Sequence, residues 1–269
     1  MVGEKWPKVA VLCITWDRAE EIRRTLDALM RHLQYPRPIR LHIADDNSEG
    51  VHPGYIDALM ADLRGRWDGQ LSYSVTDRKG WGANTNEGLK TLIGEGYRYI
   101  YQTEDDYVIT KDLDLRLGIY VLQNVPRLGF IRYRGIMGHR IAAELTEVRA
   151  EGTGLTQEGH GLHDRISFWE MLPNLTKELW MYSHGPHLKD AKKVHQRDYG
   201  FYPEGMPLGR TEEVFAHLVK DQPKSGIAIL PEWVPMRFQH IGKSRQRTPA
   251  DKESSPKAGI WSRVQVKDD

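Results

Sequence analysis

The chain has 269 residues, of which 39% are hydrophobic, and its 38 Lys and Arg residues against 37 Asp and Glu residues leave a net charge of +1. This length and composition favour one large globular domain with a sizeable core and exclude a multi-domain array and a wholly disordered chain. No apolar run approaches the roughly 18–20 residues of a membrane span, and the balanced charge provides no overall attraction to nucleic acid or to a membrane surface.

The single cysteine, Cys13, excludes an internal disulfide and a cysteine-ligated zinc ribbon. The first residues contain a short apolar stretch but neither the long apolar region nor the cleavage site of a signal peptide. Both observations fit a reducing compartment. We therefore expect a cytoplasmic protein in which Cys13 is a small core residue.

Strands and helices alternate through the first half of the chain. Apolar, β-branched runs predict strands at residues 9–15, 39–44, 71–75 and 97–102. Segments with one apolar face predict helices at residues 18–33, 55–63 and 82–93. Such a series with short connections indicates an α/β fold whose sheet is largely parallel, with right-handed crossovers.

The second half is less regular. A strand is predicted at residues 128–133, and residues 135–175 show no clean period. Beyond them the sequence predicts helices near residues 188–195 and 211–220 and short strands near residues 227–230 and 236–240.

Polar and charged residues follow each predicted strand of the first half. In chain order, these sets are residues 15–18, 45–48, 76–80 and 104–106. The carboxyl ends of parallel strands meet at one edge of a sheet, where ligands bind. Acids at helix starts and in solvated loops are the plain alternative at any single position, but their gathering on one edge favours a binding site.

The acidic run Glu104-Asp105-Asp106 is the sharpest of these features. Three successive carboxylates repel one another, and burial would raise their pKa values. A divalent cation relieves this repulsion, and Mg²⁺ or Mn²⁺ typically takes one or two carboxylates together with water and substrate phosphates. The sequence therefore predicts a metal-bridged diphosphate at this point.

Four segments carry a family resemblance. They are the first strand with its T-x-x-R pattern, HIADDNS at residues 42–48, RKGWGANTNEG at residues 78–88 and YIYQTEDD at residues 99–106. In this order they resemble the motifs of inverting GT-A-fold glycosyltransferases of the family-2 type, within the nucleotide-diphospho-sugar transferase superfamily. The resemblance covers residues 9–108 and continues more weakly to about residue 240.

The resemblance implies a GT-A-like (Rossmann-like) α/β fold, with a mostly parallel sheet flanked by helices and a smaller acceptor-side half. It implies one catalytic domain at residues 1–242 and a polar C-terminal tail at residues 243–269. Within the domain, about residues 1–110 would bind the nucleotide-sugar and about residues 111–242 would bind the acceptor.

The activity implied by the resemblance is metal-dependent transfer of a sugar from a nucleotide-sugar, usually a UDP-sugar, to an acceptor hydroxyl with inversion. The cofactor would be Mn²⁺ or Mg²⁺, held by Asp106. The residues implied at the donor are Thr15 and Arg18 near the base, Asp45 or Asp46 at the uracil or ribose, Arg78 or Lys79 beside the nucleotide, Asn84 in the glycine loop, and Asp105 at the ribose or a metal-bound water.

Two further roles come from the second half of the chain. Residues 199–215 resemble the family segment that ends in the catalytic base, so Glu213 matches the base and Glu212 is the second candidate. Such a carboxylate would take the proton of the acceptor hydroxyl, although Thr211 could equally cap a helix at this point. His240 would complete the metal shell or contact the diphosphate, and a structural histidine is the alternative.

The acceptor stays open between a saccharide, a lipid-linked sugar, a protein and a hydroxylated base in DNA. Two other classes of function also stay open: a nucleotidyltransferase that makes sugar nucleotides, and a non-catalytic domain that binds a nucleotide or glycan. The two His-x-x-His pairs, at residues 160–163 and 184–187, lack an acidic partner at helical spacing and do not favour zinc.

Overall fold

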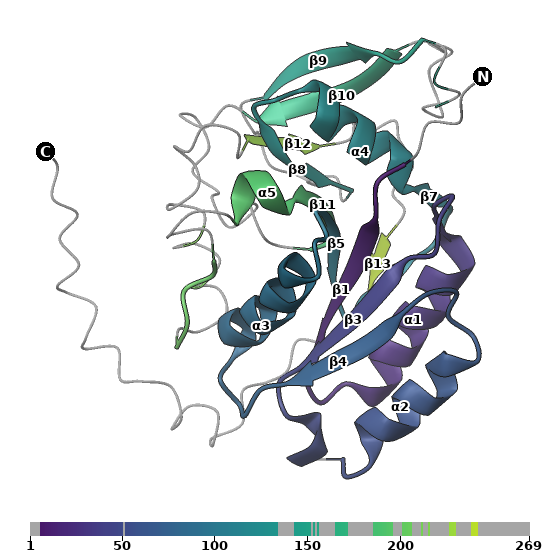
Figure 1. The fold of residues 1–269 in the computed structure, drawn as a ribbon, viewed down its shortest axis with the longest axis vertical. Helices are drawn as coiled ribbons and strands as arrows, with labels where there is room; N and C mark the ends of the chain where they lie inside the picture. Colours follow the sequence, from purple (N-terminus) through teal and green to yellow (C-terminus); the bar gives the residue numbers. More distant parts are fainter. Residues whose placement is uncertain are drawn as a thin grey trace, which may run out of the picture.

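A nine-stranded sheet runs through both halves of the protein, in the strand order β4-β3-β1-β5-β11-β8-β12-β10-β9 (Figure 1). The computed structural model describes residues 6–50, 52–133, 143–151, 153, 155, 165–171, 185–195, 201–205, 211, 215, 226–229 and 238–241. The fold is therefore described for these residues.

Four parallel strands form the first half of the sheet. They are β4 (Leu71–Val75), β3 (Arg40–Asp45), β1 (Val9–Thr15) and β5 (Tyr99–Glu104). The continuous apolar character of β1 fits its place inside a sheet that is covered on both faces. The largely parallel arrangement predicted for this half is confirmed.

The second half of the sheet is mixed. It contains β11 (His187–Asp190), β8 (Leu128–Arg132), β12 (Gly226–Ile229), β10 (Arg165–Met171) and β9 (Ala143–Arg149). Strand β11 is antiparallel to both β5 and β8, whereas β12 is parallel to β8. Strands β10 and β9 close this side as an antiparallel pair.

Helices cover both faces of the sheet, with α3 on one side and α1 and α2 on the other (Figure 1). The helices are α1 (Ala19–His32), α2 (Tyr55–Arg64), α3 (Trp81–Gly94), α4 (Leu115–Asn124) and α5 (Ala191–Val194). Successive side chains of a strand point to opposite faces, so β1 supplies both cores. Val9, Val11 and Cys13 pack with α1, α2 and α4, and Ala10 and Leu12 pack with α3 and α5. Cys13 is buried, as expected.

Short elements complete the described part of the chain. They are the 3-10 turn η1 (Ser48–Gly50), the paired strands β2 (Leu33–Gln34) and β7 (Leu113–Asp114), and the antiparallel pair β6 (Tyr107–Ile109) and β13 (Phe238–His240). No helix in the described part of the chain is both long enough and apolar enough to cross a membrane.

One sequence prediction is wrong, and three further elements were not predicted. The helix predicted at residues 188–195 is strand β11 followed by the single turn α5, because Leu188 pairs with both β5 and β8. Residues 135–175 contain strands β9 and β10, which stabilise each other by pairing. Helix α4 was not predicted, although Asp114 caps it by accepting a bond from the Arg116 amide.

Other predictions fall partly outside the described residues. Of the helix predicted at residues 211–220, the structure describes only Thr211 and Phe215, both in helical conformation and buried. The predicted tail from residue 243 lies outside the described residues, and the division into donor and acceptor halves stays a prediction.

His42 makes the stability of the sheet depend on pH. Its ring nitrogens lie 2.7 Å from Ser72 Oγ and 3.0 Å from Ser74 Oγ. Burial, with a smaller effect of Arg40, lowers the pKa of His42 from 6.5 to about 4. The folded state therefore favours the neutral ring. The resulting contribution of His42 to the free energy of unfolding is complete above pH 6.5 and is lost as the pH falls to about 4.

We expect acidification over this range to lower the free energy of unfolding by up to roughly 3 kcal/mol through His42 alone. Denaturant unfolding of the wild type and of His42→Gln at pH 7 and pH 4.5 measures the effect. The variant should lose less stability on acidification than the wild type. Equal losses in both proteins would mean that His42 does not titrate in this way.

Candidate donor and metal site

The four parallel strands end at one edge of the sheet. Thr15 is in register with Asp45, and Asp45 with Val75, while Ile14 is in register with Glu104. The loops that follow these strands therefore converge, and the structure brings the predicted donor residues of the first half together there.

The backbone of these loops is unusual. Three non-glycine residues have positive φ angles: Asp17 at 52°, Asn47 at 62° and Arg78 at 52°. One lies in each of the loops after β1, β3 and β4. Left-handed conformations of side-chain-bearing residues are unfavourable and gather at functional sites, so the backbone marks the same edge as the sequence motifs.

Asp45 and Asp46 hold these loops. Asp45 is fully buried and accepts bonds from the amide of Ser48, at 2.7 Å, and from its hydroxyl. Burial raises the pKa of Asp45, and the two bonds from Ser48 oppose this shift. Asp46 accepts bonds from the Lys79 amide at 2.9 Å and the Gly80 amide at 3.0 Å, so it fixes the loop between β4 and α3.

The remaining donor candidates are Arg78 and Lys79 in this loop and Asn84, which lies in the first turn of α3 and not in the expected glycine loop. Arg78 and Lys79 are exposed, and the Arg78 guanidinium lies 4.2 Å from the ring centroid of Trp16, a favourable cation–π arrangement. Asn84 is fully buried and donates to the Ala44 carbonyl oxygen at 2.8 Å. Asn84 therefore supports the loop, whereas Arg78 and Lys79 are accessible to a ligand.

Asp105 directly follows the last residue of β5. Its carboxylate accepts bonds from Thr15 Oγ1 at 2.8 Å, from the Trp16 amide at 3.3 Å and from Arg18 at 3.1 Å. Burial raises the pKa of Asp105 to about 7, while Arg18 lowers it and Asp106 raises it further. The structure thus places Thr15 and Arg18 directly against the acidic run.

Asp106 differs from Asp105 in that one of its carboxylate oxygens makes no hydrogen bond to the described residues. Its Oδ2 accepts a bond from Arg18 and lies 3.1 Å from His240 Nε2. Its Oδ1 is buried and has no hydrogen-bond partner among the described residues. His240 reaches this corner because β13 pairs with β6 and the Ile241 amide donates to the Asp106 carbonyl oxygen at 2.8 Å.

This donor set fits a divalent cation. A buried carboxylate oxygen without a partner and an imidazole nitrogen are both ligands of Mn²⁺, and Mg²⁺ accepts the carboxylate. The described residues contain no group of three His, Cys, Asp or Glu side chains placed to hold a metal. Among the described residues, Asp106 and His240 are the two side chains at this corner that could hold such a cation, and water and phosphate oxygens could complete its shell.

The start of α3 contacts the second half of the chain. Asn86 donates to the Tyr202 carbonyl oxygen at 2.8 Å and accepts from the Tyr202 amide at 2.9 Å. A Cβ on Gly82 would lie 2.4 Å from the Pro203 carbonyl oxygen and 2.9 Å from Thr211 Cγ2. Glu212 and Glu213 lie outside the described residues.

Two side chains of this region have buried contacts that the sequence did not predict. Asn86 could have been found as the Asn of the N-x-G pattern that ends at Gly88. Lys189 is fully buried and donates to Gln102 Oε1 at 2.6 Å and to Tyr202 at 3.2 Å. Burial lowers the pKa of Lys189 well below its usual value, and no local pattern in the sequence signals this.

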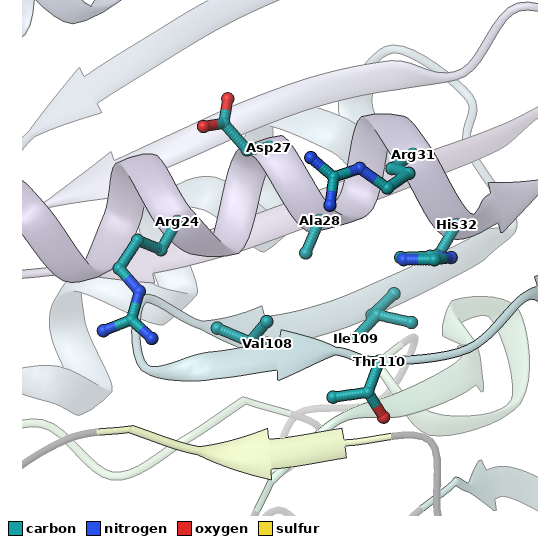
Figure 2. A pocket seen from close by; sticks show the side chains of 8 residues that line it. All are labelled: Arg24, Asp27, Ala28, Arg31, His32, Val108, Ile109 and Thr110. Carbon is teal, nitrogen blue, oxygen red and sulfur yellow. The ribbon is translucent and has the colours of Figure 1, made fainter.

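A separate groove of about 420 Å³ lies between α1 and β6. Figure 2 shows Arg24, Ala28 and His32 of α1 above Val108 and Ile109. None of the predicted site residues lines it. The groove is therefore lined by other residues than those of the acidic corner, although β6 directly follows Asp106.

The fold matches solved structures. S. aureus TarS 1–349 aligns with a TM-score of 0.57 and 14% identity over 86% of this chain and 59% of that chain. TarS 1–349 in complex with UDP-GlcNAc aligns with a TM-score of 0.54 and 14% identity over 92% of this chain and 64% of that chain. No protein-family model and no characterised protein sequence matches the chain.

The chain spans less than two thirds of the TarS 1–349 chain. At this identity the likeness establishes the fold alone. The expected fold class, a GT-A-like α/β fold with a large, mostly parallel sheet flanked by helices, is confirmed.

The contact between α3 and the second half can be tested at Gly82. We expect Gly82→Ala to lower the free energy of unfolding by about 1–3 kcal/mol, because the new Cβ collides with backbone that must move. Gly94→Ala is the matched control on the same helix, since its Cβ would meet nothing within 4 Å. Thermal unfolding should separate the two variants, and an unchanged melting temperature for Gly82→Ala would contradict this contact.

Proposed function

We propose that the protein is an enzyme that transfers a sugar from a nucleotide-sugar, in the first place a UDP-sugar, to an acceptor hydroxyl with inversion and with the help of a divalent cation. One observation carries the proposal. Asp106, at the end of β5 on a GT-A-like sheet, keeps a buried oxygen without a partner among the described residues and lies beside His240.

The nature of the donor is supported by the site and by the fold. The loops at this edge present Arg78 and Lys79 to solvent, and their charges suit the phosphates of a nucleotide. TarS 1–349, which shares the fold, has been crystallised with UDP and with UDP-GlcNAc. A UDP-sugar is therefore the first donor to test.

The proposed reaction is a single displacement. The acceptor oxygen forms a bond to the anomeric carbon while the bond from that carbon to the phosphate oxygen breaks, and the nucleoside diphosphate leaves with the electron pair. Glu213 would take the acceptor proton, with Glu212 as the second candidate. A divalent cation at Asp106 would act as a Lewis acid that neutralises charge on the leaving diphosphate.

The other residues of the edge would position the donor. Asp105 holds the β1 loop through Thr15 and the Trp16 amide, and Asp46 holds the β4 loop through the amides of Lys79 and Gly80. We propose that these loops flank the nucleotide. Fixed loops reduce the conformational freedom that is lost when the donor binds.

A thermal-shift screen of nucleotide-sugars with and without Mn²⁺ tests the donor class. A UDP-sugar should raise the melting temperature more with Mn²⁺ than without it, because binding to the folded state alone stabilises it. No shift with any nucleotide-sugar would contradict the proposal. A shift without transfer or donor hydrolysis at high enzyme concentration would instead indicate a binding domain.

The cation assignment predicts that Asp106→Asn weakens the binding of UDP in the presence of Mn²⁺ by about tenfold or more, since second-sphere changes alone weaken metal sites by about 10–100-fold. Isothermal calorimetry with and without Mn²⁺ measures the change. Asp112→Asn is the control, because Asp112 is exposed and contacts His32 and Gln34. Equal affinity for UDP with Mn²⁺ in the wild type and in Asp106→Asn would contradict the assignment of Asp106 as a cation ligand.

The base assignment predicts that Glu213→Gln lowers kcat by about 10²–10⁴-fold, the usual contribution of a general base. The affinity for UDP with Mn²⁺ should stay at the wild-type level. Glu212→Gln is the matched comparison, being the same change one residue away. A large loss in Glu212→Gln alone would transfer the role of base to Glu212.

A further inference from the structure

Arg18 lies across both acids of the proposed metal corner. Its NH1 atom donates to Asp105 Oδ1 at 3.1 Å and also to Asp106 Oδ2. The two carboxylates are 6% and 3% exposed, whereas the Arg18 side chain is 25% exposed. One partly exposed guanidinium therefore neutralises charge in a buried acidic corner.

Without the Arg18 guanidinium, the buried carboxylates of Asp105 and Asp106 would lie side by side and repel each other. A buried charge is unfavourable unless it is paired, and Arg18 supplies such a pair. The guanidinium thus does part of what a divalent cation would do at the same place. Both cations would act on the same carboxylate, because Asp106 Oδ2 already contacts both Arg18 and His240.

A divalent cation and a guanidinium repel each other at such short range. We propose that Arg18 is an internal counter-ion that competes with the divalent cation for Asp106, so that the cation binds tightly only when an anionic group of the donor draws the guanidinium away. This inference rests on the proposed function, since it assumes that Asp106 binds a cation. Shared phosphate ligands already couple the cation to the nucleotide in the proposed function, and this inference adds a second source of that coupling, the displacement of Arg18.

The surroundings allow Arg18 to move. Its backbone carbonyl accepts the Ile22 amide at 3.0 Å, so the start of α1 does not depend on the Arg18 side chain. Asp105 would keep its bonds from Thr15 and from the Trp16 amide. The cation-ready state would then be a minor population of the free protein, and the apparent cation affinity is reduced by that fraction.

The test measures Mn²⁺ binding by the electron paramagnetic resonance signal of free Mn²⁺, with and without UDP. The variants are Arg18→Ala, Arg18→Lys and Arg23→Ala. Arg23 is the matched control because it is an exposed arginine in α1, the helix that Arg18 directly precedes. Asp106→Asn shows which part of the Mn²⁺ binding belongs to this corner.

We expect Arg18→Ala to bind Mn²⁺ about tenfold more tightly than the wild type in the absence of UDP, within the usual range of coupling between sites. Arg18→Lys should fall between the two, and Arg23→Ala should match the wild type. UDP should strengthen Mn²⁺ binding to the wild type. The factor by which UDP strengthens Mn²⁺ binding should be much smaller in Arg18→Ala. If removal of Arg18 destabilises the apo protein, added Mn²⁺ should restore the melting temperature.

Two failures can be told apart. If Asp106→Asn abolishes Mn²⁺ binding but Arg18→Ala binds Mn²⁺ no more tightly than the wild type, the competition is overturned and the proposed function stands. If Asp106→Asn leaves Mn²⁺ binding unchanged in every background, both the competition and the metal part of the proposed function fail.

Discussion

The structure of the site depends on one buried carboxylate, that of Asp105. Its oxygens accept bonds from Thr15, the Trp16 amide and Arg18. Its own backbone is fixed as well, because its amide donates to Ile14 at 3.0 Å and its carbonyl accepts from Thr25 at 2.6 Å. A buried carboxylate is tolerated only when its bonds are made, so β1, β5 and α1 must meet correctly before the corner can form. Asp106 is placed as a consequence.

The acids of this edge look alike in the sequence but differ in what they do. Asp45 and Asp46 follow β3 and form internal bonds that shape loops. Asp105 joins two strands and a helix. Asp106 alone among these four has a buried oxygen with no partner in the described part of the chain. The sequence could predict where the acids gather, because strand ends follow from the apolar pattern. The sequence could not predict the different role of each acid, because these roles depend on burial and on partners far away in the chain.

Secondary-structure elements were predictable where the local sequence reveals them, and were not where they depend on partners far away in the chain. The parallel strands of the first half are buried on both faces, and their apolar runs are visible locally. Strand β11 was predicted as part of a helix, and its charged residues Lys189 and Asp190 give no local sign of a buried strand. In the structure both residues are buried: Lys189 donates to Gln102 and Tyr202, and Asp190 forms a bidentate pair with Arg98. These partners come from other segments, so no local period reveals the strand.

Two of the contacts that join the halves of the chain lie beside the site. The pairing of β13 with β6 brings His240 to Asp106 across 134 positions of sequence. The start of α3 binds the second half through Asn86 and Tyr202, and the absence of a side chain at Gly82 admits Pro203 and Thr211. The Asp46 carboxylate fixes the loop that leads into α3. Direct contacts therefore join the loop held by Asp46, the start of α3 and the residues Tyr202, Pro203 and Thr211 of the second half.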